Sequence, residues 1–330
     1  MLKVVIVGNG EMASSLLLGV KEAGHKVVGI FRSERKDVNP FLLFLKDLFA
    51  PTDFYMLAKS QGIPEIKAKS VNSEYFRREI RRLQADVVLV ATWGEKFLPK
   101  TISTPRLCTV NCHPSLLPKH RGPNPYMSVL WQGEEKTGVT FHLMDKNFDT
   151  GPILYQQEVP VLFSDTGYTL KLRCVQNARQ SLAHLLNGIE NATLAPQNQD
   201  DLRSSYFKRI TPKDIYVDFS MAPIDIYNKV RAFNPWAHCY LKIKNQFLKI
   251  GHAQIVNLNQ QFFMVKNKKY RMPDVYFGEK AGRVISKGPN WILCTTIDAE
   301  HAILLYDVSL FGFCKGFLTK SFIKRLKIVK

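Results

Sequence analysis

No apolar run in this sequence approaches the ~18 residues that a membrane-spanning helix requires. The apolar run at the N-terminus, Leu2–Val7, is interrupted at once by Gly8-Asn9-Gly10-Glu11, so it is too short for the core of a secretory signal. Internal repeats and low-complexity segments are also absent. These absences favour a cytoplasmic globular protein, and 330 residues suffice for one large or two medium domains.

Cysteine is sparse and shows none of the spacings that bind metals. The six cysteines stand at positions 108, 112, 174, 239, 294 and 314 and form no Cys-x-x-Cys pair. We therefore expect reduced thiols and no zinc site.

Acidic residues are scarce in the C-terminal part. Residues 1–200 hold 24 Lys and Arg against 19 Asp and Glu, a net charge of +5, whereas residues 201–330 hold 22 against 9, a net charge of +13. This asymmetry suggests a polyanionic partner, although a basic surface without specific recognition has the same composition. The segment Lys266–Arg271 mixes cations with an aromatic ring, as nucleic-acid surfaces do, and a basic tail ends the chain at Lys320–Lys330. Either segment is also compatible with a plain solvated charge run.

Strands alternate with helices in the N-terminal part. Strands are expected at 2–8, 26–31, 86–91 and 107–110, and helices from the first strand to Val20 and around 40–49, 53–60 and 73–83. This alternation predicts an α/β fold with a doubly wound, mostly parallel sheet. In such sheets the functional site lies at the carboxyl ends of the strands.

The remainder of the chain has a different pattern. The polar stretch Asn191–Ser205 is typical of a linker or a long surface loop. Short apolar runs follow it, at Tyr240–Ile243, Phe247–Ile250, Gln261–Val265, Trp291–Thr296 and Ala302–Val308. Several short strands with turn signals predict a small barrel. We expect one domain over residues 1–200 and a second over 201–330.

Asn111 and His113 follow the strand expected at 107–110, two residues apart. Because side chains alternate along a strand, both project from the same side. An amide donor beside a titratable base is what acyl transfer needs, since one group polarises the carbonyl and the other accepts a proton. Two polar residues at a strand end are nevertheless common, so the pair alone does not identify a site.

Three further segments extend the pattern of Asn111–Gly122: Thr137–His142, which enters an alternating strand; Phe148–Leu154, which places Asp149 in a Gly/Pro turn; and Arg231–Trp236. With these segments the chain resembles the formyltransferases that use 10-formyltetrahydrofolate, from residue 1 to about residue 310. It is most similar to the members that act on methionyl-tRNA. The resemblance implies a formyltransferase, Rossmann-like catalytic domain and an OB-like β-barrel after it.

Roles for individual residues follow from the chemistry and from the resemblance. His113 suits a general base, because an imidazole has a reference pKa of about 6.5. Asn111 would donate to the developing oxyanion and Asp149 would orient His113. The resemblance implies that 10-formyltetrahydrofolate is bound by Trp93, Gly94, Ser115, Leu116, Leu117, Pro118 and Asp145. It implies that the acceptor is bound by Arg32, Arg121, Gly122, Asn234 and Trp236.

Some side chains near this pattern have a second interpretation. Leu116 and Leu117 pack either the pterin or the protein core. We expect His142 to be a strand-packing residue and His120 a surface residue. The chemistry requires no metal, and none is indicated.

Two segments bear on the identity of the acceptor. Where the tRNA enzymes of the family carry a basic, glycine-rich insertion, this chain has Arg32–Pro40 followed by the apolar segment 41–49. The segment Pro123–Tyr126 also departs from the tRNA enzymes. The basic C-terminal part and the segment Arg231–Trp236 nevertheless favour the amino group of methionyl-tRNA as the acceptor, with a nucleotide-linked amino sugar or another small amine as the alternative.

Two other classes of function are less favoured. Gly8-x-Gly10-x-x-Ala13 follows a strand as a dinucleotide-binding fingerprint does, which raises an NAD(P)-dependent reductase. The second strand ends in Phe31-Arg32-Ser33 without the expected acid, and the glycines are explained by a tight turn. A binding protein with an inactive site is disfavoured because Asn111, His113 and Asp149 are all present.

Overall fold

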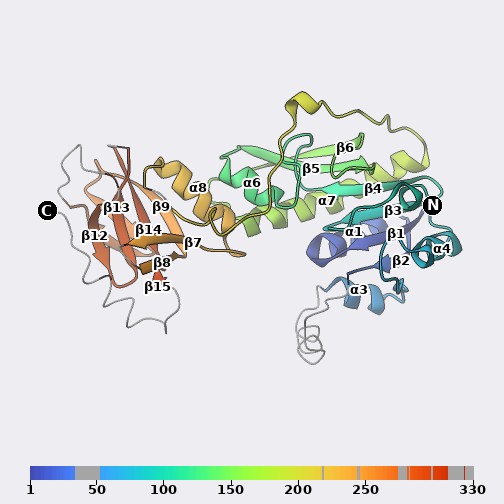
Figure 1. Cartoon of the computed structure of the whole chain (residues 1–330), viewed down its shortest axis with the longest axis horizontal. Helices are drawn as coiled ribbons and strands as arrows, with labels where there is room; N and C mark the ends of the chain where they lie inside the picture. The colour runs from blue at the N-terminus through green and yellow to red at the C-terminus, as the bar shows by residue number, and fades with distance from the viewer. Residues whose placement is uncertain are drawn as a thin grey trace. The chain divides into compact units, whose positions relative to one another are not determined.

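The computed structural model describes residues 1–33, 53–217, 219–243, 246–273, 281, 283–298, 300–310 and 323. The chain folds into two compact units. The first comprises Met1–Pro125, Lys136–Pro160 and Lys171–Lys208, and the second Tyr126–Glu135, Val161–Leu170 and Arg209–Lys330. Figure 1 labels most of their helices and strands. The helix expected around 40–49 lies outside the described residues, as does most of the basic tail.

A six-stranded sheet forms the first unit, in the order β2-β1-β3-β4-β5-β6. Its strands are β1 (Lys3–Gly8), β2 (Lys26–Phe31), β3 (Val87–Ala91), β4 (Cys108–His113), β5 (Lys136–Leu143) and β6 (Ile153–Pro160). The first four pair in parallel, whereas β5 and β6 run antiparallel to their neighbours. The Rossmann-like sheet is thus confirmed, and it mixes parallel with antiparallel strands. The connection between β5 and β6 is short, and only antiparallel strands can be joined by so short a turn.

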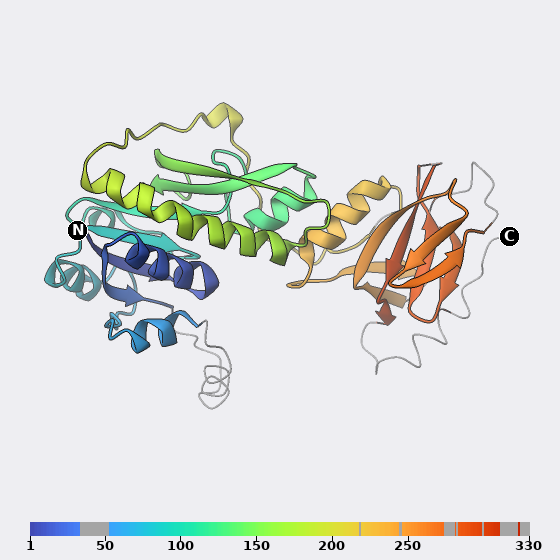
Figure 2. The ribbon, with the colours of Figure 1, turned by 180° about the vertical axis from the view of Figure 1, so that it is seen from behind.

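The helices of this unit are α1 (Gly10–Glu22), α3 (Phe54–Ser60), α4 (Glu74–Arg82), α5 (Pro99–Ile102) and most of α7 (Gly167–Glu190). Helix α4 begins where the Ser73 side chain accepts the backbone N–H of Phe76, and it buries Phe76 and Ile80, which lie four residues apart on one face. Figure 2 shows α7 beside β5 and β6, and the Tyr155 and His184 rings meet there at 4.6 Å. No helix among the described residues is long and apolar enough to cross a membrane.

The second unit is rich in β-structure. It contains helices α6 (Pro125–Trp131, of which Pro125 belongs to the first unit) and α8 (Pro223–Phe233), and strands β7 (Cys239–Ile243), β8 (Gln246–Ile250), β9 (His252–Asn257), β10 (Phe262–Val265), β11 (Lys268–Arg271), β12 (Val284–Gly288), β13 (Trp291–Thr295), β14 (His301–Tyr306) and β15 (Ser309–Leu310). They pair as β12-β13-β14-β9, as β15-β8-β7 and as the hairpin β10-β11. Buried Trp291, Leu293 and Leu304 lie in its core. The described strands form no closed barrel, so the OB-like barrel stays a prediction.

Candidate active site

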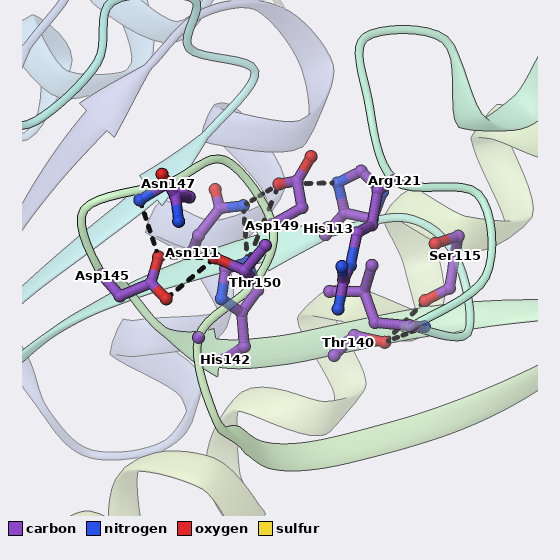
Figure 3. A network of polar contacts seen from close by, with 12 residues as sticks. Asn111, His113, Ser115, Arg121, Thr140, His142, Asp145, Asn147, Asp149 and Thr150 are labelled. Carbon is purple, nitrogen blue, oxygen red and sulfur yellow. Dashed lines mark hydrogen bonds and ion pairs between the residues drawn. The ribbon is translucent and has the colours of Figure 1, made fainter. Parts of the chain in front are cut away.

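Asn111 and His113 lie in β4, and their side chains reach the same carboxylate. The Asn111 Nδ2 is 3.3 Å and the His113 Nδ1 is 3.4 Å from Oδ1 of Asp149. Strand β4 places them, because alternate residues share a face and β4 lies between β3 and β5 in the sheet. Figure 3 shows the three side chains pointing toward one another. The buried sheet core thus delivers an amide, an imidazole and a carboxylate to one point.

Asp149 lies in the turn between β5 and β6, with its backbone in the left-handed region at φ +58°. Such a conformation costs an L-residue about 1–2 kcal/mol, so the turn must be held by its surroundings. The Asp149 Oδ2 accepts the backbone N–H of Gly122 at 3.0 Å. Within the turn, the Asp145 carboxylate accepts the backbone N–H of Asn147 and the hydroxyl of Thr150. Asp145, expected to bind the formyl donor, therefore organises the turn that carries Asp149.

The electrostatics keep His113 neutral and Asp149 ionised. Burial lowers the pKa of His113, while the Asp149 charge and the hydrogen bond with the His120 carbonyl oppose that shift. Burial alone would raise the pKa of Asp149, but His113, which is protonated in the acid range where this carboxyl titrates, together with His142 and the Gly122 N–H lowers it to about 2.

One ring nitrogen of His113 is left to accept a proton. The Nε2 atom lies 3.0 Å from the carbonyl oxygen of His120, which can only accept, so a neutral ring carries its hydrogen on Nε2. The lone pair on Nδ1 then faces Asp149. Proton uptake at Nδ1 converts the 3.4 Å contact into an ion pair.

His142 belongs to this polar network, a contribution that sequence reasoning missed. Its Nδ1 lies 2.9 Å from the Leu143 carbonyl oxygen, so Nδ1 donates and Nε2 accepts from Asn111 Nδ2 at 3.1 Å. Both amide hydrogens of Asn111 are therefore engaged, one by His142 and one by Asp149. The polar His142 in the otherwise apolar end of β5 was the available signal, and in the structure it pairs directly with Asn111 across β4 and β5.

The loop Ser115–Pro118 is fixed by β5 and β6. The Thr140 hydroxyl donates to the Ser115 carbonyl at 2.6 Å, and the Gln156 amide donates to the Leu117 carbonyl at 2.7 Å. Leu117 is buried, whereas half-buried Leu116 covers Gly138 so closely that a Cβ there would lie 2.4 Å from it. Leu117 thus packs the core, and Leu116 packs β5.

Trp93 and Gly94 follow β3. The Trp93 ring packs on Phe31 at 5.3 Å, and its buried Nε1 has no hydrogen-bond partner among the described residues. Apart from Gly94 and its two chain neighbours, no atom of the described residues lies within 4 Å of the position that a Cβ on Gly94 would occupy. Arg32 bonds Glu65 at 2.7 Å and stacks over Tyr55 at 4.1 Å, so its charge is already paired.

The residues predicted to bind the acceptor are divided between the two units. Arg121 is buried in the first unit, beside Gly122, whose φ of +109° suits glycine. Asn234 and Trp236 belong to the second, where Asn234 donates to the Gly251 carbonyl and Trp236 packs on Tyr126.

The expectation that His120 lies at the surface is wrong. His120 is 3% exposed, because its backbone turns inward at φ +58° and its N–H bonds the Ser205 hydroxyl. The His142 prediction is confirmed as far as packing goes, since that side chain is buried in β5.

The described cysteines do not take part in this chemistry. They are free thiols, and burial raises the pKa of Cys108 to about 11 and that of Cys239 to about 12. A raised pKa disfavours the thiolate, which is the nucleophilic form of cysteine, at neutral pH. Among the residues described, no three His, Cys, Asp or Glu side chains are grouped to hold a metal ion.

At the end of β4, this Rossmann-like sheet brings together an amide, an imidazole and a carboxylate, side chains that acyl transfer can use. Sequence comparison identifies the family. The family of the formyl transferases matches residues 2–186, and the formyl transferase C-terminal domain matches residues 209–310. The chain belongs to the formyl transferase family and is a formyltransferase.

Relatives with different acceptors resemble this chain. A methionyl-tRNA formyltransferase of Pseudoalteromonas translucida (strain TAC 125) is 28% identical over 305 residues, covering 92% of this chain and 88% of that protein. The structure of WlaRD, a sugar 3N-formyl transferase with dTDP and 5-N-formyl-THF, matches with TM-score 0.64 at 19% identity, over 95% of this chain and 99% of that one. The N-formyltransferase from Helicobacter canadensis, with folinic acid and dTDP-3-aminofucose, matches with TM-score 0.65 at 19% identity, over 93% and 99%.

Proposed function

We propose that this enzyme transfers a formyl group from 10-formyltetrahydrofolate to a primary amine in the cytoplasm. Residues 1–200 would form the catalytic domain, and residues 201–330 a basic, OB-like domain. The observation that carries the proposal is the convergence of Asn111 and His113 on Asp149. The donor is supported by the similar structures, which were solved with 5-N-formyl-THF and folinic acid.

His113 serves as the general base. When the amine attacks the N10-formyl carbon, Nδ1 of His113 takes the proton that the amine nitrogen loses. Asp149 is ionised at neutral pH, so its negative charge stabilises the resulting imidazolium. The same proton then passes to the folate N10 as the carbon–nitrogen bond breaks, which yields a formamide and tetrahydrofolate and returns His113 to its neutral form.

Asn111 stabilises the negative charge that develops on the formyl oxygen. Its N–H to Asp149, at 3.3 Å, is the longer of its two hydrogen bonds and the one to be exchanged for the oxyanion. A single donor of this kind contributes roughly 3–4 kcal/mol in other acyl-transfer sites. His142 keeps the amide turned so that its nitrogen, not its oxygen, faces the reaction.

The donor would lie against the loop Ser115–Pro118, with Trp93, Gly94 and Asp145 around it. The hydrogen bonds from Thr140 and Gln156 hold the loop before any ligand arrives. This preorganisation avoids an ordering cost on binding.

Methionyl-tRNA is the acceptor we favour. The charge of residues 201–330 suits a polyanion, and the β10-β11 hairpin combines cations with an exposed ring, since Lys269 lies 4.0 Å over Phe262. The tRNA enzyme of Pseudoalteromonas translucida also matches over both parts of the chain. Arg32, Arg121, Gly122, Asn234 and Trp236 would contact this acceptor.

A nucleotide-linked amino sugar is the second candidate. Two sugar N-formyltransferases match this fold over 99% of their own chains. An acceptor of that size would leave the charge of residues 201–330 without a role in catalysis.

Release of tetrahydrofolate from 10-formyltetrahydrofolate tests both candidates. Methionyl-tRNA and a panel of dTDP-linked amino sugars are supplied as separate acceptors. Turnover with methionyl-tRNA alone is the expected result. Turnover with an amino sugar alone would overturn the tRNA assignment and keep the catalytic roles, and absence of turnover with every amine would overturn formyl transfer from this donor.

A further inference from the structure

The polar stretch expected to be a linker returns to the active site within the first unit. Gln197 exchanges backbone hydrogen bonds with Ile153 at 2.7 and 2.8 Å. Arg121 donates its N–H to the Ser205 carbonyl at 2.8 Å and accepts the N–H of Phe207 at 2.9 Å. Main-chain bonds therefore hold this segment on both sides of Gln199.

The Gln199 side chain uses its full hydrogen-bonding capacity. Its Nε2 donates to the carbonyl oxygens of Asp149 at 3.0 Å and Gly151 at 2.8 Å. Its Oε1 accepts from Nε and Nη2 of Arg121 at 3.1 and 2.8 Å. A primary amide offers two donor hydrogens and two acceptor lone pairs, and all four are satisfied here.

The two elements that Gln199 joins carry the proposed base and its partner. The loop containing Arg121 supplies the His120 carbonyl to His113 and the Gly122 N–H to Asp149. The turn contributes Asp149 itself, at φ +58°. The turn also packs closely against the end of β5, because a Cβ on Gly151 would lie 1.8 Å from the Leu143 carbonyl oxygen. The separation of loop and turn therefore sets the spacing between His113 and Asp149.

We propose that Gln199 is a positioning residue that holds Asp149 against His113 by tying the β5–β6 turn to Arg121. This inference rests on the catalytic roles proposed above for His113 and Asp149. Gln199 acts through the turn and does not touch the reacting atoms. A strained backbone at a reactive carboxylate persists only where neighbours hold it, and Gln199 is the side chain that bonds both carbonyls flanking Thr150.

The test compares Gln199→Met, which keeps length without hydrogen bonds, with Gln199→Asn, which is one methylene too short to join both elements. Gln197→Met is the matched control, because its side chain is exposed on the same segment. We expect kcat to fall about tenfold or more in both Gln199 variants, since small displacements of catalytic groups have effects of this size, with KM for the donor within about twofold. The control should retain kcat.

A second readout does not depend on turnover. NMR titration of the His113 ring should give a lower pKa in the Gln199 variants, in the same direction as in Asp149→Asn, because the Asp149 charge raises the pKa of His113. Besides Asp149, His142 of β5 acts on the charge of His113, and the adjoining loop carries the charged or titratable residues Lys119, His120 and Arg121.

The outcomes separate this proposal from the one on which it rests. An unchanged kcat and His113 titration in a folded Gln199 variant would overturn it, as would an equal loss of kcat in Gln197→Met. If Gln199→Met does not fold, Gln199→Asn decides. If the wild-type protein turns over no acceptor, formyl transfer fails as a function, and the titration alone still decides whether Gln199 positions Asp149.

Discussion

The two units differ in how far the residues proposed to act in them are exposed to water. In the first, the side chains of His113 and Asp149 are 6% and 11% exposed, and each is held by the backbone or by another side chain. In the second, the β10-β11 hairpin leaves Phe262 and Met264 42% and 44% exposed beside Lys268 and Lys269. A dry site strengthens charge interactions, whereas a wet surface leaves them sensitive to salt. The difference agrees with the proposed division, in which the first unit carries the chemistry and the second recognises the acceptor.

The largest expected effect comes from His113→Ala. It should lower kcat at least about a hundredfold, the lower end of general-base contributions. Affinity for tRNA should not change, since the second unit would carry recognition. Single-turnover kinetics and filter binding measure the two quantities. His301→Ala, in the second unit, is the matched control and should keep kcat. A full rate in His113→Ala would contradict the assignment of the chemistry to His113 in the first unit.

Sequence alone predicted the first unit well where the physics is local. Strand β2 lies at the expected Lys26–Phe31, because a short apolar run after a Gly turn is compatible with few structures other than a strand. The placement of Asn111 and His113 on one face follows from alternation in β4. Asp149 and Gln199 reach the same site through tertiary contacts, and the hydrogen bonds of Gln199 span 48 and 50 residues along the chain. A polar stretch predicts a loop but not the partners that the loop finds.

The second unit was predicted less completely. Strands β7, β8, β10, β13 and β14 coincide with apolar runs. Strand β11 is mostly exposed and β9 is mostly half-buried or exposed, and neither offers such a run. Helix α8 was missed, although Pro223 stands at its first turn and Ile226, Val230 and Phe233 follow at helical spacing. Exposed edge strands and short helices are specified by neighbours, so composition alone leaves them unseen.

A smaller effect is expected from replacing Lys268 and Lys269 together with Ala. If both contact tRNA phosphates, the slope of log affinity against log salt should fall by about two, because each contact releases close to one counterion. The same charge removed at exposed Lys26 and Lys100 of the first unit is the control and should leave the slope unchanged. Binding measured across a salt series gives the slope. Equal slopes for both double variants would show that the charge of the second unit acts only as a general field.

The smallest expected effect is on stability in acid. Burial lowers the pKa of His113 in the folded state, so below the unfolded value of about 6.5 the unfolded chain binds a proton that the folded chain refuses. The free energy of unfolding should therefore fall as pH drops below 6.5, by at most about 1.4 kcal/mol per pH unit from this group. Asp149, whose pKa is lowered from 3.8 to about 2, adds a second loss as pH falls through that range.

Urea unfolding at pH 7.5, 6.0 and 5.0 measures the His113 contribution. His113→Ala should flatten the dependence on pH, since the variant has no imidazole at that position to protonate on unfolding. His238 of the second unit provides the comparison. Burial lowers its pKa as well, but this residue is only half-buried. Its desolvation is weaker, so His238→Ala should flatten the dependence less. The reverse order would mean that the second unit, and not the enclosed polar site of the first, dominates the response to acid.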